Sequence, residues 1–418
     1  MHPSETSHLS QPGADPSCWP LDPSVIFLNH GSFGSCPRPV LDFQQTLRER
    51  MEQQPIRFFV RDLEGLLDEA RRDLGVFINA PPNDLAFVPN ATAGVNTVLR
   101  SFSFNAGDEL LVTNHEYNAC RNALDYAAKR AGAQVVVAEI PFPLHREDEI
   151  ADAIMGRVTA RTRLALIDHV TSQTGLILPV ARLARELSER GVDLVVDGAH
   201  APGMVPLDLV NLGAAFYTGN CHKWICAPKG AAFLYVRPDR QQFIRPLTIS
   251  HGANSPRTDR SRFQIEFGWT GTWDPTAMLS VPEALRFMET RLRGGWPEIM
   301  RRNRDLALAA RQLLCRTLQI PSPCPDSLIG SLASVPLSDS TDASPAASPL
   351  YADPLQDKLR AEDSIEVPVI PWPAPPKRVL RISCQLYNAL PQYEVLGESL
   401  AALLKGQPRA RGSRASVR

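Results

Sequence analysis

Two residues of complementary chemistry, Asp197 and Lys223, lie 26 residues apart, each just after a short apolar run. The run VDLVVDG is β-branched and closed by an acid and a glycine, which predicts a buried strand. GAAFYTGN predicts a second strand, which brings the lysine to the same sheet edge. Open α/β sheets bind ligands at the carboxyl ends of their strands. A lysine for a Schiff base and an acid that keeps a pyridine nitrogen protonated are what pyridoxal phosphate requires.

The motifs around these two residues are more specific than either residue alone. D-G-A-H at 197–200 precedes N-C-H-K at 220–223 and then P-K-G at 228–230. An isolated Asp–Lys pair is more often structural, but the joint pattern resembles the class V aminotransferases, a family of fold-type-I pyridoxal phosphate enzymes. GNCHKW, together with WTGTWDPT at 269–276, is most similar to the isopenicillin N epimerase branch of that family. The resemblance covers roughly residues 24–400.

The resemblance implies a role for each matching residue. Lys223 carries the cofactor and removes the α-proton, Asp197 binds the pyridine nitrogen, and Tyr117 stacks on the ring. For the acid that returns a proton to the α-carbon from the face opposite Lys223, the sequence offers Tyr117, His115 and His30, and Tyr117 is the first choice because of its stacking position. His115 competes with Tyr117 for the stacking position. The remaining cofactor contacts that it implies are Thr92, Ala93, Ser172, His200, Asn220, His222 and, across a dimer interface, Thr272. The substrate contacts are Arg381, as a clamp for the α-carboxylate, with Asn29, His30 and Gly31.

The segment at 85–102, LAFVPNATAGVNTVLRSF, predicts a strand, a tight turn and a helix. Residues 90–93 occupy the helix start, where free backbone N–H groups and the helix dipole favour an anion. An N-cap threonine alone is a common feature. In combination with Lys223, the turn predicts the site of the cofactor phosphate.

Strands that alternate with helices over residues 85–235 predict a doubly wound, mainly parallel α/β sheet. The resemblance implies a fold-type-I pyridoxal phosphate transferase with a large cofactor-binding domain and a smaller α+β C-terminal domain. The large domain begins with a segment, about 23–45, expected to pack near the small domain and the substrate pocket. The expected boundaries are a flexible N-terminal arm at 1–22, the large domain at 23–284, the small domain at 285–405 with a flexible loop at 337–354, and a basic disordered tail at 406–418.

Composition narrows the class of partner. The formal net charge is −1, so neither nucleic acid nor an anionic membrane is expected. No signal peptide is expected, and no apolar run of the sequence is long enough to span a bilayer. Eight scattered cysteines make no disulfide framework, and Cys221 and Cys226 have no second pair at metal-ligand spacing. A cytoplasmic protein without a metal is expected, and the resemblance implies a homodimer with shared active sites.

Several reactions at the α-carbon of an amino acid or aminoacyl substrate are compatible with these residues. Epimerisation follows from the branch resemblance, and transamination and C–S lysis are the alternatives. A cysteine desulfurase is disfavoured, because residues 355–380 contain no cysteine and Cys384 comes only after Arg381. A non-catalytic binding or regulatory protein is disfavoured by the presence of both Lys223 and Asp197.

Overall fold

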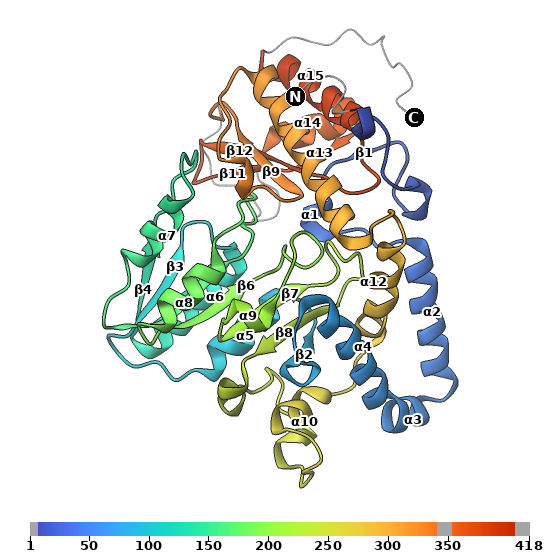
Figure 1. Ribbon diagram of the computed structural model, residues 1–418, viewed down its shortest axis with the longest axis vertical. Helices are drawn as coiled ribbons and strands as arrows, with labels where there is room; N and C mark the ends of the chain where they lie inside the picture. Colours follow the sequence, from blue (N-terminus) through green and yellow to red (C-terminus); the bar gives the residue numbers. More distant parts are fainter. Residues whose placement is uncertain (1–6, 341–352, 406–418) are drawn as a thin grey trace.

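Short apolar, β-branched runs form a seven-stranded sheet in the computed structural model, which describes residues 7–340 and 353–405 (Figure 1). The strand order is β2-β8-β7-β6-β5-β3-β4. Five neighbouring strands run parallel to one another: β7, β6, β5, β3 and β4. Strand β8 is antiparallel to both of its neighbours, β2 and β7. The predicted α/β class with a doubly wound, mainly parallel sheet is confirmed. The strands are β2 Leu85–Val88, β3 Glu109–Thr113, β4 Gln134–Ala138, β5 Thr162–Asp168, β6 Asp193–Asp197, β7 Phe216–Asn220 and β8 Ala232–Val236.

Each face of this sheet packs against its own helices, because alternate side chains of a strand point to opposite faces. Along β6, Val195 belongs to one apolar core while Leu194 and Val196 belong to the other. The helices that contribute to the Val195 core are α5 Ala91–Ser101, α6 Asn118–Ala131 and α10 Arg262–Gly268. Those on the other face include α4 Leu63–Ile78, α7 Asp148–Met155, α8 Val180–Ser188, α9 Leu209–Leu212 and α12 Val281–Glu289.

The first long helical stretch of the chain is interrupted at Pro55. Helix α2, Arg38–Gln53, ends just before this proline, whose ring cannot follow an α-helical residue without a clash. The chain continues as α3 Pro55–Arg57 and a π-helical turn at Phe58–Asp62 before α4 begins. Segments α2, α3 and α4 lie together at one side of the large sheet, drawn in blue in Figure 1.

A smaller unit of helices and short strands caps the carboxyl edge of the large sheet, drawn in orange and red in Figure 1. Its antiparallel sheet has the order β11-β12-β9, and β1 forms a separate parallel pair with β10. Its elements are α13 Gly295–Leu318, β9 Leu332–Pro336, α14 Pro354–Asp363, β10 Ile365–Glu366, β11 Val369–Pro371, β12 Arg378–Ser383 and α15 Leu390–Leu404.

The N-terminal segment is packed where a loose arm was expected. Trp19 is buried, and its ring lies 5.2 Å from that of Tyr387. The Gly13 amide donates to the carbonyl of Leu386 at 2.7 Å, and strand β1, Ile26–Phe27, continues into the small unit. Apolar side chains such as Trp19 explain this packing. Within the expected flexible loop at 337–354, residues 341–352 lie outside the described residues. The expected tail at 406–418 also lies outside them.

No helix within the two described ranges combines the length and the apolar character needed to cross a bilayer.

Candidate active site

The parallel strands β5, β6 and β7 bring their last residues to one edge of the sheet. Asp168 and Asp197 end β5 and β6 and are direct neighbours in register. Asp197 is buried; its Oδ1 accepts the amide of Ala199 at 2.9 Å, and its Oδ2 accepts the thiol of Cys120 at 3.1 Å. These two donors hold the carboxylate in place at the sheet edge.

Lys223 follows β7 at the same edge, as the sequence predicted. Its Nζ lies 3.0 Å from Nε2 of His200. Burial, followed by the charge of Arg381, lowers the pKa of Lys223 to about 7, against a smaller opposing effect of Asp197. Burial, then Lys223, holds the pKa of His200 well below its usual value, so its neutral Nε2 accepts from the lysine. A large part of the Lys223 side chains is therefore uncharged and nucleophilic at neutral pH.

Arg381 is a buried cation with hydrogen bonds only to neutral groups. Its Nη1 donates to the carbonyl of Ser172 at 2.7 Å, and its Nη2 donates to Ser32 Oγ at 2.7 Å and Asn29 Oδ1 at 3.2 Å. Among the described residues it has no ion pair, and its Nε has no hydrogen-bond partner. Burial lowers its pKa to about 10. An unneutralised guanidinium at this position suits the carboxylate of a substrate.

Tyr117 is the aromatic residue that remains available at the site. It forms the N-cap of α6 and is 38% exposed. Burial raises the pKa of its phenol, while the nearby charge of Arg381 opposes that shift. His115, its competitor, is buried and engaged through both ring nitrogens, with Thr174 Oγ1 at 2.7 Å and the carbonyl of Ile140 at 3.0 Å. The geometry therefore favours Tyr117 over His115 as the residue that meets a ring.

The predicted phosphate turn is present, but its amides are partly used. Ala91 N–H donates to Asn220 Oδ1 at 2.9 Å, and Ala93 N–H donates to Asn90 Oδ1 at 2.8 Å. Oδ1 of Asn220 thus caps α5, and the Ala93 amide is occupied by Asn90. The expected contact of Asn220 with the phosphate, for which its side-chain amide N–H groups are the donors, stays a prediction. The amide and hydroxyl of Thr92 have no partner in the part of the chain that the structure describes.

Two further predicted phosphate contacts lie in different surroundings. His222 is half-buried, with Nδ1 3.2 Å from the carbonyl of Ala231. Burial, then Lys223, lowers the pKa of His222 to about 4, so it is a neutral hydrogen-bonding group. Thr272 is exposed between α10 and α11, Thr276–Leu279. Its expected contact with a partner's phosphate stays a prediction.

His30 differs from the expectation for a substrate contact. It is completely buried, with Nδ1 2.8 Å from the hydroxyl of Tyr387 and Nε2 3.0 Å from the carbonyl of Lys223. Burial lowers its pKa to about 3. His30 therefore stabilises the backbone at Lys223 through a hydrogen bond to its carbonyl. Gly34, in the same turn, has φ +68°, and a side chain there would collide with the carbonyl of His222, so this turn requires glycine.

Sequence reasoning missed four residues at this edge: Ser32, Glu116, Cys120 and Asp168. Asp168 could have been predicted from the sequence, because an acid follows the apolar run in RLALIDH just as one follows the run in LVVDG. Cys120 lies one turn into α6, and nothing in its local sequence indicates that its thiol donates to Asp197. Among the described residues, Glu116, Cys120 and Asp197 are the one group whose ligand atoms approach metal-binding distances. The expected absence of a metal stays a prediction.

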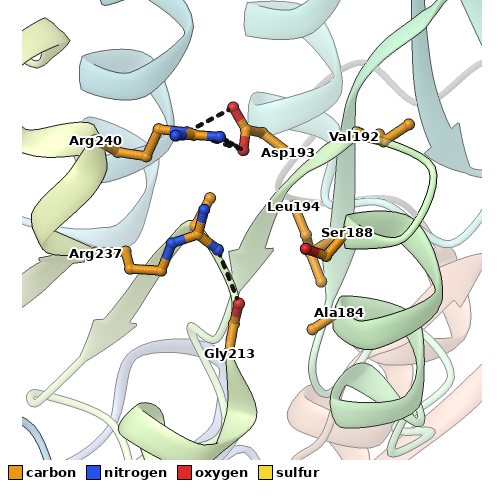
Figure 2. Close-up of a pocket in the computed structure, with 10 residues that line it drawn as sticks. Ala184, Ser188, Val192, Asp193, Leu194, Gly213, Arg237 and Arg240 are labelled. Carbon is orange, nitrogen blue, oxygen red and sulfur yellow. Dashed lines mark hydrogen bonds and ion pairs between the residues drawn. The ribbon is translucent and has the colours of Figure 1, made fainter.

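A hollow away from these residues, shown in Figure 2, lies near the amino end of β6. Its arginines are already paired: Arg240 contacts the Asp193 carboxylate at 3.0 Å, and Arg237 donates to the carbonyl of Gly213 at 3.2 Å. The unpaired Arg381 and the unoccupied Thr92 amide are both elsewhere. We therefore assign the active site to the carboxyl edge, around Lys223.

The residues at the carboxyl edge fit pyridoxal phosphate. A half-buried lysine with a lowered pKa, an acid held by two donors, and a helix start with a free amide would meet its aldehyde, pyridine nitrogen and phosphate. Fold and site together define a pyridoxal phosphate enzyme of fold type I. Residues 35–321 match the family described as Aminotransferase class-V, and the chain belongs to that family.

Known relatives extend over nearly the whole chain. Isopenicillin N epimerases of Amycolatopsis lactamdurans and Streptomyces clavuligerus are 37% and 34% identical, over 92% of this chain and 96% of theirs. A probable chloroplastic L-cysteine desulfhydrase of Arabidopsis thaliana is 32% identical, over 92% of this chain and 84% of its own. A solved C-DES mutant with glycine covalently linked to its PLP cofactor has a TM-score of 0.75 at 22% identity, covering 93% and 99%. The predicted family, fold class and cofactor are confirmed.

Proposed function

We propose that the chain epimerises an amino acid or aminoacyl substrate at its α-carbon, as the name of its isopenicillin N epimerase relatives implies. Identities of 37% and 34% over almost the full length of both chains support this reaction. The observation that carries it is the presence of two acid–base groups, Lys223 and Tyr117, which both interact electrostatically with the unpaired Arg381. Inversion requires one group to remove a proton and another to return it to the opposite face.

In this mechanism Arg381 binds the substrate carboxylate through its two terminal nitrogens, and Ser32 and Asn29 hold the guanidinium in place. Bound pyridoxal phosphate supplies the electron sink that makes the α-hydrogen acidic. Lys223, uncharged in part at neutral pH, accepts that proton at Nζ. The phenol of Tyr117 keeps its proton at neutral pH, because its pKa is raised, and donates it from the other side.

A C–S lyase is the second candidate, because L-cysteine desulfhydrases are also among the relatives, at 30–32% identity. A lyase needs Lys223 and Arg381 but no second proton donor that inverts the centre. A desulfurase is supported less, since Cys384 is buried and burial raises its pKa to about 12. That thiol carries almost no thiolate at neutral pH.

The deciding experiment is incubation of the purified holoenzyme with isopenicillin N and L-cysteine, each in deuterated water. Epimerisation predicts α-deuterium in both stereoisomers of isopenicillin N and no keto acid. Release of sulfide from L-cysteine without inversion of any substrate would replace the proposal with the lyase. Accumulation of a keto acid and a pyridoxamine spectrum would replace it with an aminotransferase. A Lys223→Ala variant serves as the control for non-enzymatic exchange.

A further inference from the structure

A cluster of buried acidic groups lies next to Asp197. Asp168 is its register neighbour on β5, and Glu116 comes from the turn between β3 and α6. Ligand atoms of Glu116, Cys120 and Asp197 all lie within 4.8 Å of one another. All four side chains are buried, with exposed fractions of 5% or less. The mechanism above gives no role to Glu116 or Asp168.

The carboxyl groups of this cluster differ in the number of hydrogen bonds that they receive. Asp197 accepts from two donors, Ala199 N–H and Cys120 Sγ. In contrast, both carboxyl oxygens of Glu116 and Oδ2 of Asp168 are buried and receive no hydrogen bond from a donor in the described ranges. The carboxyl groups of Glu116 and Asp168 contact each other. Two carboxylates offer only acceptors, so a hydrogen bond between them requires a proton on one.

We propose that Glu116 and Asp168 share one proton, and that the single negative charge of this pair favours the protonated pyridine nitrogen that Asp197 holds. Both would be positioning residues that act through Asp197. The pair faces Asp197 on β6, the protonated thiol of Cys120 on α6 and, at longer range, the amine of Lys223 after β7. This role depends on the bound cofactor and is the same for either candidate reaction.

The directions of the pKa shifts in this cluster are those that a shared proton requires. Burial, then the charges of Asp168 and Asp197, raises the pKa of Glu116 well above its usual value. Burial, then Asp197, does the same to the pKa of Asp168. Burial and Asp197 also raise the pKa of Cys120 well above its usual value, which keeps its thiol a donor to Asp197. The two donors of the cluster, Ala199 N–H and the Cys120 thiol, both go to Asp197, so the hydrogen bond between Glu116 and Asp168 has to come from a proton of their own.

The first test is infrared spectroscopy of the purified holoprotein at pH 8, where a protonated carboxylic acid gives a carbonyl band that ionised carboxylates lack. We expect such a band in the unmodified protein and its loss in both Glu116→Gln and Asp168→Asn, because in each variant the amide donates the hydrogen bond that the proton supplied. Glu109→Gln is the matched control. Glu109 begins β3 at the opposite edge, is buried, and pairs with Arg161. Its substitution should leave the band unchanged.

The second test is the pH midpoint of the visible absorbance of the bound cofactor. Each single amide variant keeps one negative charge in the pair, so its midpoint should match that of Glu109→Gln. The double variant Glu116→Gln/Asp168→Asn removes that charge and should lower the midpoint by about half a unit to one unit. A pair that holds two protons keeps its band in both single variants, which contradicts the proposal.

Absence of the band from the unmodified protein also contradicts it, as does a double variant whose midpoint equals that of the control. Should the double variant fail to retain the cofactor, the infrared bands of the single variants still decide whether the proton is shared.

Discussion

At the scale of single residues, two lysines near the sheet edge are candidates for the Schiff base with the cofactor, and only one lies in surroundings that favour its neutral, nucleophilic form. Lys223 lies 3.0 Å from His200 and has a pKa lowered to about 7, whereas Lys229 donates to the carbonyl of Gly34 at 3.1 Å. Borohydride reduction of the holoenzyme and peptide mapping should therefore place the pyridoxyl group on Lys223. Its appearance on Lys229 would move the site.

The pKa of Lys223 also predicts how cofactor capture depends on pH. The neutral amine is the nucleophile, and lowering the pKa to about 7 means that its fraction rises through pH 7 and is nearly complete a unit above. The capture rate of the apoprotein should rise and level off in that range, measured by stopped-flow absorbance. An ordinary lysine, with a pKa of about 10.4, would still be gaining rate at pH 9.

Tyr117→Phe separates the two faces of the substrate. Phenylalanine keeps the ring that can stack, but it removes the hydroxyl that returns the proton. We expect α-deuterium exchange from one stereoisomer to persist while inversion falls by about 10²-fold or more. Chiral chromatography and mass spectrometry measure both rates. The control is Tyr126→Phe, an exposed tyrosine on the same helix. Unchanged inversion together with slower exchange would exclude Tyr117 as the second acid.

At the scale of elements, the start of α5 is the feature that a phosphate would use. Asn90 and Asn220 cap its first amides, so Thr92 supplies the free donors. Thr92→Val keeps the shape and removes one hydroxyl. We expect the apparent Kd for pyridoxal phosphate to rise about 5- to 15-fold, from the loss of about 1–1.5 kcal/mol. Equilibrium dialysis or fluorescence titration measures this change.

Thr97→Val is the matched control on the same helix. The hydroxyl of Thr97 donates to the carbonyl of Ala93 at 2.7 Å and is buried. Its loss should change the melting temperature of the apoprotein and leave cofactor affinity nearly unchanged. Equal losses of affinity in the two valine variants would mean that Thr92 acts through helix stability alone.

Elements and their ends were the most predictable part of the molecule. The runs ending in Asp197 and Asn220 became parallel neighbours, and Pro55 interrupts helix formation, as a proline does. Period-2 burial and proline geometry are local properties, so a sequence pattern captures them. The packing of Trp19 was missed, because the N-terminal segment gains its order from Tyr387, far along the chain.

Hydrogen-bond direction within the site was the least predictable part. His30 was expected to face the substrate but turns to Tyr387 and the carbonyl of Lys223, and Asn220 turns to the start of α5. A residue type and a position in a motif do not fix a rotamer, which depends on partners from distant segments. The same reason concealed Glu116 beside Asp168.

At the scale of the whole molecule, several apolar side chains remain on the outside near α2–α4. Ile56, Val60 and Val76 are 74%, 73% and 81% exposed. Trp269 and Trp273, half-buried on the segment that carries Thr272, pack against the apolar cluster around Phe58. Contiguous exposed apolar surface marks sites that meet another chain, and α2–α4 are the segments where such surface is to be sought. We expect a homodimer in which Thr272 of each subunit contacts the cofactor phosphate of the other, as the sequence resemblance implies.

A mixing experiment tests this shared site. Thr272→Asp puts a like charge beside a phosphate, so it should reduce cofactor retention and activity, whereas the same change at exposed Thr317 should not. Lys223→Ala subunits are inactive but keep Thr272. In a mixed dimer with Thr272→Asp, one site then combines an intact Lys223 with an intact Thr272 from the other subunit. After dissociation and random reassociation, the mixture should regain about a quarter of the unmodified activity. If Thr272 serves its own subunit, no site in the mixture gains a functional pair, and activity stays at the mean of the two variants.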